Sequence, residues 1–89
     1  MTNPLIIPTV HLNGTGKDTL VNEYVNAMSA MDKAIETFRK ITVHGRDYYP
    51  QGNNAINEAL HQRSKQLEEL MTVRNELETI AIAISEQGK

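Results

Sequence analysis

The residues best suited to chemistry lie in one short stretch near the middle of the chain, where Arg46 is followed closely by Tyr48 and Tyr49. A guanidinium group holds a phosphate through two parallel hydrogen bonds, and tyrosine rings stack on bases. Asn53 and Asn54 come next, and the N-terminus of a helix that starts after them would add backbone donors for an anion. The stretch therefore indicates a site for a small phosphorylated molecule that carries a base.

The same residues also fit a structural role. Arg46 and Asp47 are able to tie the stretch together, while the two tyrosine rings pack over the end of a helix pair. The sequence leaves the ligand-binding and the structural interpretation open.

A second candidate for anion binding precedes the first expected helix, where Gly14 and Gly16 lead into Lys17. A nucleotide-hydrolysing P-loop needs glycine five residues before the Gly-Lys pair and Ser or Thr after the lysine, and this chain has His11 and Asp18 there. We reject a P-loop on that ground. Exposed N–H groups at a helix start beside a lysine still hold anions, so Lys17 joins the candidate ligand-binding residues.

Residues that would carry catalysis or a metal are scattered along the chain. There is no cysteine, and the three histidines lack the short spacings of zinc sites. The acidic residues are spread along solvated helical faces, where pairs with lysine or arginine are ordinary. We therefore expect a protein that is not an enzyme, with no metal and no cofactor.

Length and charge narrow the class further. A chain of 89 residues forms one small domain, and its net charge of −2 argues against general nucleic-acid binding. No apolar run approaches the roughly 20 residues of a membrane span, so no membrane association is expected. The first residues lack a basic segment and are interrupted by Pro4 and Pro8, which argues against a signal peptide. These features favour a cytoplasmic location.

Hydrophobic periodicity predicts an all-α fold, an antiparallel two-helix hairpin at 15–89 behind an extended N-terminal arm at 1–14. The expected elements are a helix at about 16–42, a loop at 43–54 and a helix at about 55–86. Apolar residues recur at alternating steps of three and four, which is typical of a seam between helices. The expected seam residues are Tyr24, Met28, Met31, Ile35, Phe38, Thr42, Ile56, Leu60, Leu67, Leu70, Leu77, Ala81 and Ile84, with Arg63 and Arg74 as structural interruptions.

Local patterns predict how the helices begin and end. Thr15 and Asp18 fit a capping box, Gly45 is expected to adopt the left-handed conformation after the first helix, and Asn54 is expected to cap the second. The arm should lie extended on a helix surface, its own or a neighbour's, with the edge of a small sheet as the alternative.

The second helix is expected to be longer than the first, with an apolar C-terminal end, Ile80–Ile84, that projects beyond its partner. Because a helix that is apolar all round needs to be buried all round, this overhang predicts a homo-oligomeric bundle.

Two motifs, His11-Leu12-Asn13-Gly14-Thr15 and the eight residues at 45–52 (GRDYYPQG), stand here without gaps. In these motifs the chain resembles a family of small uncharacterised accessory proteins of tailed bacteriophages, over roughly residues 5–86. The resemblance implies a protein that acts in the cytoplasm of the infected host, and it carries over no activity and no binding residues. In type, the chain is also similar to helical phage proteins that sequester nucleotide immune signals.

Two functions are therefore expected as alternatives. The first is a non-enzymatic phage accessory protein that binds and sequesters a small nucleotide-type signal and so counters host immunity. The second is a helical protein-interaction module that docks on a host or phage protein and inhibits or remodels it. A pocket that holds both tyrosine rings and Arg46 would favour the first, and a flat surface with outward-pointing rings would favour the second.

Overall fold

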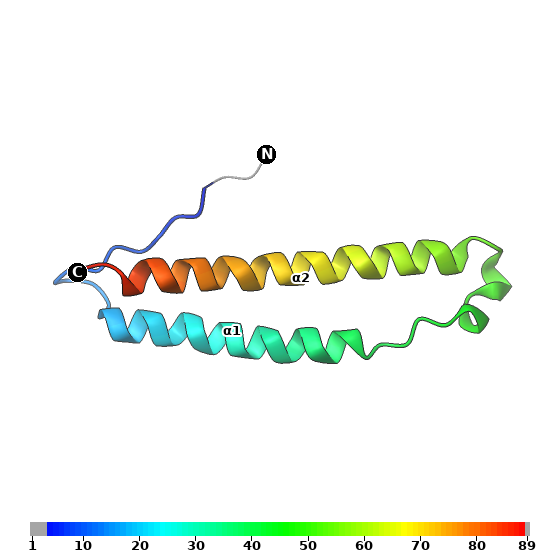
Figure 1. The fold of residues 1–89 in the computed structure, drawn as a ribbon, viewed down its shortest axis with the longest axis horizontal. Helices are drawn as coiled ribbons and strands as arrows, with labels where there is room; N and C mark the ends of the chain where they lie inside the picture. The colour runs from blue at the N-terminus through cyan, green and yellow to red at the C-terminus, as the bar shows by residue number, and fades with distance from the viewer. Residues whose placement is uncertain (1–3, 89) are drawn as a thin grey trace.

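Two long helices packed side by side in opposite directions make up most of the structure, a computed structural model that describes residues 4–88 (Figure 1). Helix α1 spans Lys17–Arg39 and helix α2 spans Ala55–Ser85, and the molecule measures 61 × 28 × 18 Å. Two short 3-10 helices, η1 (Gly45–Asp47) and η2 (Tyr49–Gln51), lie in the connection. The predicted all-α hairpin is confirmed. No strand occurs within residues 4–88, so the described part of the arm is not a sheet edge.

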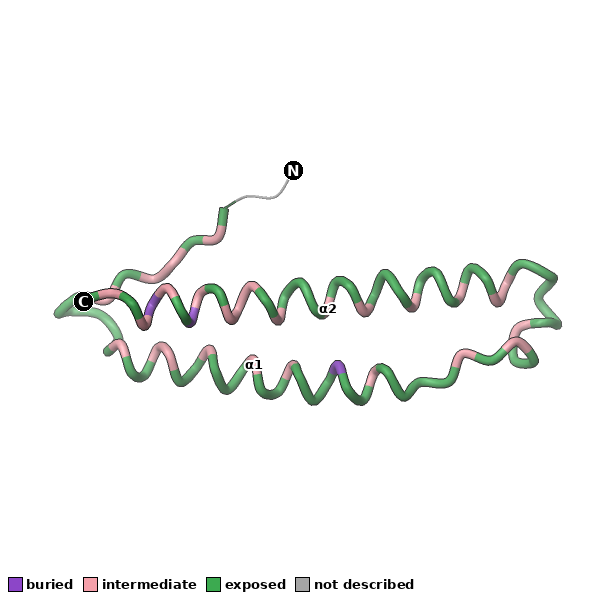
Figure 2. Tube along the Cα trace, viewed as in Figure 1, coloured by how far each residue is buried: buried purple, intermediate pink, exposed green. Residues whose placement is uncertain are grey.

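The facing sides of α1 and α2 form a thin seam rather than a deep core (Figure 2). Only Ile35, Ala81 and Ile84 are buried among the described residues. Leu60, expected in the seam, is 48% exposed, and the small Ala59 is half-buried beside it. The other seam residues that lie in the two helices are half-buried: Tyr24, Met28, Met31, Phe38, Ile56, Arg63, Leu67, Leu70, Arg74 and Leu77.

The register of the two helices differs from the expectation. The ammonium group of Lys17, at the start of α1, donates to the carbonyl of Gln87 at 2.8 Å, just beyond the end of α2. The apolar end of α2 therefore lies level with α1 instead of projecting beyond it. The overhang is at the other end of α2, beside the loop. The predicted apolar overhang is wrong because contacts between the helices, and not their lengths, set the register.

Each helix ends at a cation supplied by the other helix. The guanidinium of Arg63, on α2, donates to the carbonyls of Phe38 at 3.0 Å, Arg39 at 2.8 Å and Ile41 at 2.7 Å. At the end of α2, the ammonium group of Lys17 likewise donates to the carbonyl of Gln87 and, at 3.5 Å, to the carbonyl of Ser85. Positive charge at a helix C-terminus is favourable because the unpaired carbonyls carry partial negative charge.

The sequence predicted that the first helix ends near residue 42, but α1 ends at Arg39. The Arg63 cap explains this earlier end. The N–H of Lys40 donates to Thr37 three residues back, which tightens the last turn, and Arg63 takes the carbonyls that a further turn would use. The predicted left-handed Gly45 is also wrong, since it starts η1. Among the described residues only Gly52, at a φ of 114°, and Gly88 have positive φ.

Arg63 and Arg74 hold the hairpin together, in agreement with the structural role expected for them. The guanidinium of Arg63 lies 5.0 Å from the centre of the Phe38 ring, a cation–π distance. Arg74 donates to Asp32 of α1 at 2.9 Å and to Glu78 of α2 at 3.0 Å. The hydrogen bond to Asp32 is the main cause that raises the pKa of Arg74 above its ordinary value, so this guanidinium stays charged.

The predicted capping box at Thr15 is wrong. The N-cap of α1 is Gly16, in extended conformation, and no side chain donates to or accepts from the cap. Asp18 still lies in the first turn, where its negative charge is favourable.

We expect Thr15→Ala to change the free energy of unfolding by less than about 0.5 kcal/mol, as for an ordinary surface substitution. A loss of about 1 kcal/mol in chemical denaturation, typical of a lost N-cap, would contradict this assignment.

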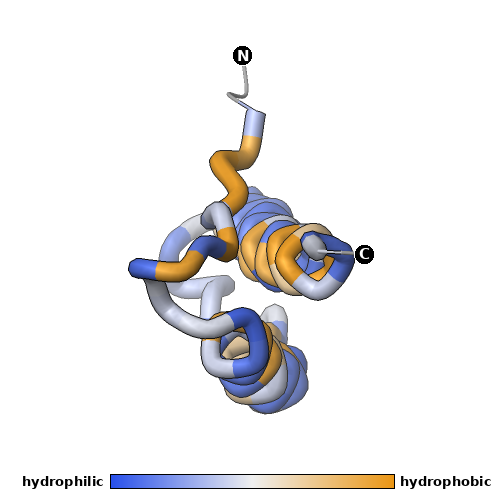
Figure 3. The backbone as a smooth tube through the Cα atoms, turned by 90° about the vertical axis from the view of Figure 1, so that its left-hand side faces the viewer, coloured by the Kyte–Doolittle hydropathy of each residue, from blue (hydrophilic) through white to orange (hydrophobic). Residues whose placement is uncertain are grey.

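The described part of the arm lies on the side of α2 opposite to α1 (Figures 1 and 3). The side chain of Gln87 bonds to it there, and Leu5, Ile7 and Val10 are half-buried. The amide of Gln87 accepts from the N–H of Val10 at 2.7 Å and donates to the carbonyl of Pro8 at 2.7 Å. Ile6 and Leu12 are 86% and 99% exposed, so much of the arm's apolar surface is free in one chain.

Candidate functional site

The loop that carries Arg46, Tyr48 and Tyr49 is an ordered element built from η1 and η2. Backbone N–H groups donate three residues back through both turns, from Asp47 to His44 at 3.0 Å and from Gln51 to Tyr48 at 2.9 Å. The Nδ1 of His44 accepts from the N–H of Arg46 at 3.3 Å and caps η1. The backbone of Gly52, in a region that favours glycine, then turns the chain toward α2.

Arg46 and Tyr49 project from this loop into solvent. The side chain of Arg46 is exposed and makes no hydrogen bond or ion pair with the residues at 4–88. Tyr49 is 75% exposed, whereas Tyr48 is half-buried. The alternative in which Arg46 ties the loop together therefore has no contact to support it. One free guanidinium and one free ring are thus carried by the same ordered loop, three residues apart in the chain.

Asn53 and Asn54 are exposed between this loop and α2. Asn54 is the N-cap residue, as expected, but its side chain makes no capping hydrogen bond because its backbone is helical, at φ −96° and ψ −9°. A shallow depression of about 340 Å³ begins at Asn54 and continues along the first turns of α2 past His61. Its lining is polar: Asn54, Asn57, Glu58, His61 and Gln62.

The structure does not bring Lys17 to the other candidate residues within one chain. Lys17 is at the end of the hairpin where α1 begins and α2 ends, and the loop is at the opposite end (Figure 1). Its ammonium group is engaged by the carbonyls of Ser85 and Gln87, next to a small depression of about 290 Å³. In a single chain Lys17 is thus a helix cap, and the loop residues form a cluster of their own.

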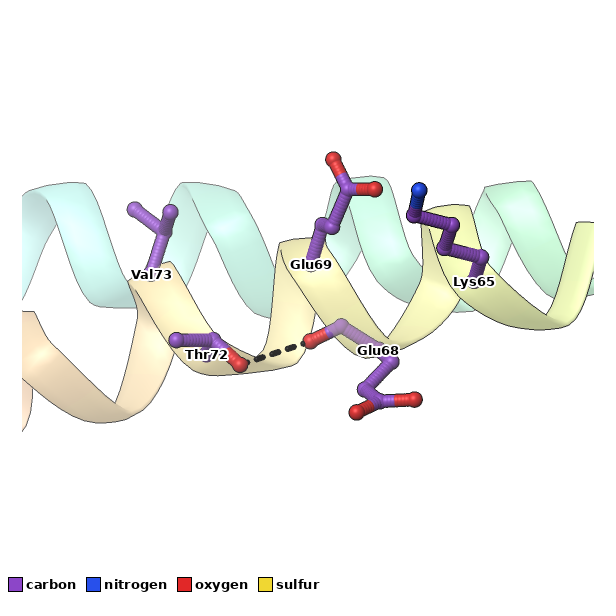
Figure 4. Close-up of a pocket in the computed structure, with 5 residues that line it drawn as sticks. All are labelled: Lys65, Glu68, Glu69, Thr72 and Val73. Atoms are coloured by element: carbon purple, nitrogen blue, oxygen red, sulfur yellow. Dashed lines mark hydrogen bonds between the residues drawn. The ribbon is translucent and has the colours of Figure 1, made fainter. Parts of the chain in front are cut away.

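The depressions found on the described surface lie away from the loop cluster. Five shallow depressions mark the described surface, and none of these five is lined by Arg46, Tyr48 or Tyr49. One of about 530 Å³ lies on the outer side of α2 (Figure 4). All its lining residues come from that one helix, and the Thr72 hydroxyl is already bonded to the Glu68 carbonyl at 2.9 Å. It is the outer surface of a helix and not a cleft between elements.

Between residues 4 and 88, no three His, Cys, Asp or Glu side chains come close enough together to hold a metal ion. Neither helix in this range has a stretch long and apolar enough to cross a membrane.

No protein-family model, curated protein or solved structure matches this chain.

Sequence reasoning missed the roles of Arg63 and Gln87. Arg63 was expected to cover apolar surface and reach water or a carboxylate. Its guanidinium instead donates to backbone carbonyls at the C-terminal end of α1. Gln87 lies beyond the expected second helix and holds the arm. The only signal in the sequence is an arginine at a seam position opposite the end of the other helix.

Proposed function

We propose that the protein is a helical interaction module that acts by docking its loop end on another protein. The observation that supports this most directly is that Arg46 and Tyr49 are both exposed on an ordered loop. Arginine and tyrosine are among the residue types that most often dominate binding energy at protein interfaces, and a fixed backbone lowers the entropy cost of binding.

The chemistry of the pair defines the kind of partner. Arg46 offers five donors to a carboxylate, and the Tyr49 ring fits an apolar slot with a polar rim. The motifs at 11–15 and 45–52 resemble those of phage accessory proteins. On that basis the proposed partner is a host or phage protein in the cytoplasm of the infected cell, and the contact inhibits or remodels this partner.

Affinity capture with paired variants tests this proposal. The protein is immobilised and exposed to lysate of infected and of uninfected bacteria, beside Arg46→Ala and Lys40→Ala as matched charge-removing variants. Lys40 is exposed near the loop and makes only a long ion pair of 3.9 Å with Glu36. We expect one partner to be retained by the native protein and by Lys40→Ala, and lost with Arg46→Ala. Equal retention by all three would contradict the proposal.

A second function, sequestration of a small phosphorylated nucleotide signal, is supported by the exposed guanidinium of Arg46 and the exposed ring of Tyr49 on the same loop, since arginine takes phosphate and tyrosine stacks on bases. It needs a pocket, which in this fold a second copy of the chain would have to complete. Thermal shift against cyclic di- and trinucleotides and ADP-ribose derivatives tests it. At 100 times its dissociation constant, a ligand adds about 2.7 kcal/mol of stability and raises the melting temperature by roughly 10 °C or more. A panel without any shift would remove this function.

A further inference from the structure

Four large apolar side chains on one side of the hairpin are left uncovered. They are Val25 of α1, 45% exposed, and Leu60, Met71 and Ile82 of α2, 48%, 39% and 53% exposed. The three residues of α2 are eleven positions apart, which is about three turns of a helix, so they form one row. We call these four residues the Met71 face.

Polar contacts between the helices indicate that Val25 lies on the same side of the hairpin as the row on α2. Asp32 follows Val25 by seven residues and Glu78 follows Met71 by seven, about two turns in each case. Arg74 bonds both carboxylates, at 2.9 and 3.0 Å. Arg39, a further seven residues along α1, contacts the sulfur of Met71 at 3.6 Å. The Met71 face thus borders Arg39 and also Arg74 with its two bonded carboxylates, four groups whose charges cancel.

The spacing of the row has the symmetry of a twofold contact. Leu60 and Ile82 lie at equal distances from Met71, each about 16 Å away along α2. In an isologous dimer with its axis at Met71, that residue meets its own copy, and Leu60 meets the partner's Ile82. The row spans about 33 Å, and across two helices its footprint is on the order of 600 Å² per copy, close to the 800 Å² per partner of common stable interfaces.

Charge is distributed in a way that favours this antiparallel arrangement. Residues 33–66, around the loop end, hold six Lys or Arg and three Asp or Glu, a net charge of +3. The remaining residues, 1–32 and 67–89, hold three Lys or Arg and eight Asp or Glu, a net charge of −5. Two copies in parallel would set like charges together, whereas antiparallel copies set the basic end of one against the acidic end of the other. Arg39 would then approach the partner's Asp32.

We propose that the Met71 face is the interface of a homodimer in which two hairpins lie antiparallel about a twofold axis at Met71. The dimer covers apolar surface that a hairpin with three buried residues leaves in water. It does not rest on either function proposed above.

The arrangement has a consequence for the candidate site. Asn54 and Gln87 lie on opposite sides of Met71, each about 25 Å away along α2. The twofold axis therefore brings the Lys17 end of one copy level with the loop end of the other. A pocket formed in this way, at each end of the dimer, is the place where a ligand would contact residues of both copies.

The first test compares two substitutions that differ in the face they alter. Met71→Asp places two carboxylates against each other at the axis and should weaken the dimer at least about a hundredfold in sedimentation equilibrium. Val73→Asp is the matched control because Val73 is also exposed, at 43%, and lies about 200° around α2 from Met71. It should leave the dimer intact. A 10.0 kDa native species at 100 µM, or dissociation by Val73→Asp alone, overturns the proposal.

The second test gives the orientation and does not depend on the stability of a charged variant. Because the chain has no cysteine, Met71→Cys, Leu60→Cys and Ile82→Cys each carry a single thiol. Under oxidation or with a short bis-maleimide, Met71→Cys should form a covalent dimer. The other two should form one only when they are mixed. Efficient self-linking of Leu60→Cys or Ile82→Cys would show parallel copies and overturn the proposal, as would the failure of Met71→Cys to link.

Discussion

Replacement of Arg63 by methionine is expected to lower the free energy of unfolding by about 2–3 kcal/mol. Methionine keeps much of the aliphatic stem but leaves the carbonyls of Phe38, Arg39 and Ile41 without a charged donor. A hydrogen bond to a charged group contributes about 1.5–3 kcal/mol. The loss of the cation–π contact with Phe38 adds to this, while removal of the buried, unpaired Nε of Arg63 offsets part of it.

Urea denaturation at one fixed protein concentration measures this effect. For a chain of this size the expected loss lowers the melting temperature by roughly 10–20 °C. Lys65→Met is the matched control because Lys65 is exposed two residues further along α2 and makes no hydrogen bond with residues 4–88. Arg63→Lys should lie between the two, since an ammonium group cannot reach three carbonyls as a fork does. A loss below 0.5 kcal/mol for Arg63→Met would show that water serves the end of α1 equally well.

The second large effect concerns binding. Arg46→Ala and Tyr49→Ala are each expected to weaken binding of the loop's partner by roughly ten- to a hundredfold, with helicity and association state unchanged. A charge-assisted contact or a stacked ring contributes about 1–3 kcal/mol, and each 1.4 kcal/mol is one decade of affinity. Because neither side chain is buried, their removal leaves no cavity in the fold.

Circular dichroism and titration against the captured partner measure both quantities. Tyr49→Phe separates the ring from its hydroxyl, and it should retain binding where the ring is the main contact. Tyr48→Ala is less clean, since Tyr48 is half-buried and its loss also disturbs the turn. If Arg46→Ala and Tyr49→Ala melt the protein, the loop is structural, and if they change nothing, the docking surface lies on the arm or on the outer faces of the helices.

Much of the fold was predictable because it follows from periodicity. The alternating steps of three and four along α1 and α2 give the seam from Tyr24 to Phe38 and from Leu67 to Ile84, since only one face of a helix can meet a neighbour. The ends of the elements were less predictable. The end of α1 depends on Arg63, and the register depends on Lys17 and Gln87, contacts between residues 22–70 positions apart that local patterns do not contain.

The candidate site was predictable in part for the same reason. The types and spacing of Arg46, Tyr48 and Tyr49 mark the loop, and its backbone turns follow from the short-range preferences of Gly and Pro. Whether Lys17 shares a pocket with them depends on the assembly of whole chains. The sequence also gives no warning that Tyr49 is free and Tyr48 half-buried, since both precede Pro50 in the same short turn.

The two cationic caps also set an order of folding. Arg63 joins chain segments 22–25 residues apart, whereas Lys17 joins segments 68–70 residues apart. Closing the longer loop costs about 1 kcal/mol more in chain entropy. The hairpin should therefore form first beside the loop and grow toward the chain ends, so that the Lys17 cap and the arm are the last parts to close. In reverse, thermal opening begins there, and a docked loop end can stay folded while the Lys17 cap is still opening and closing.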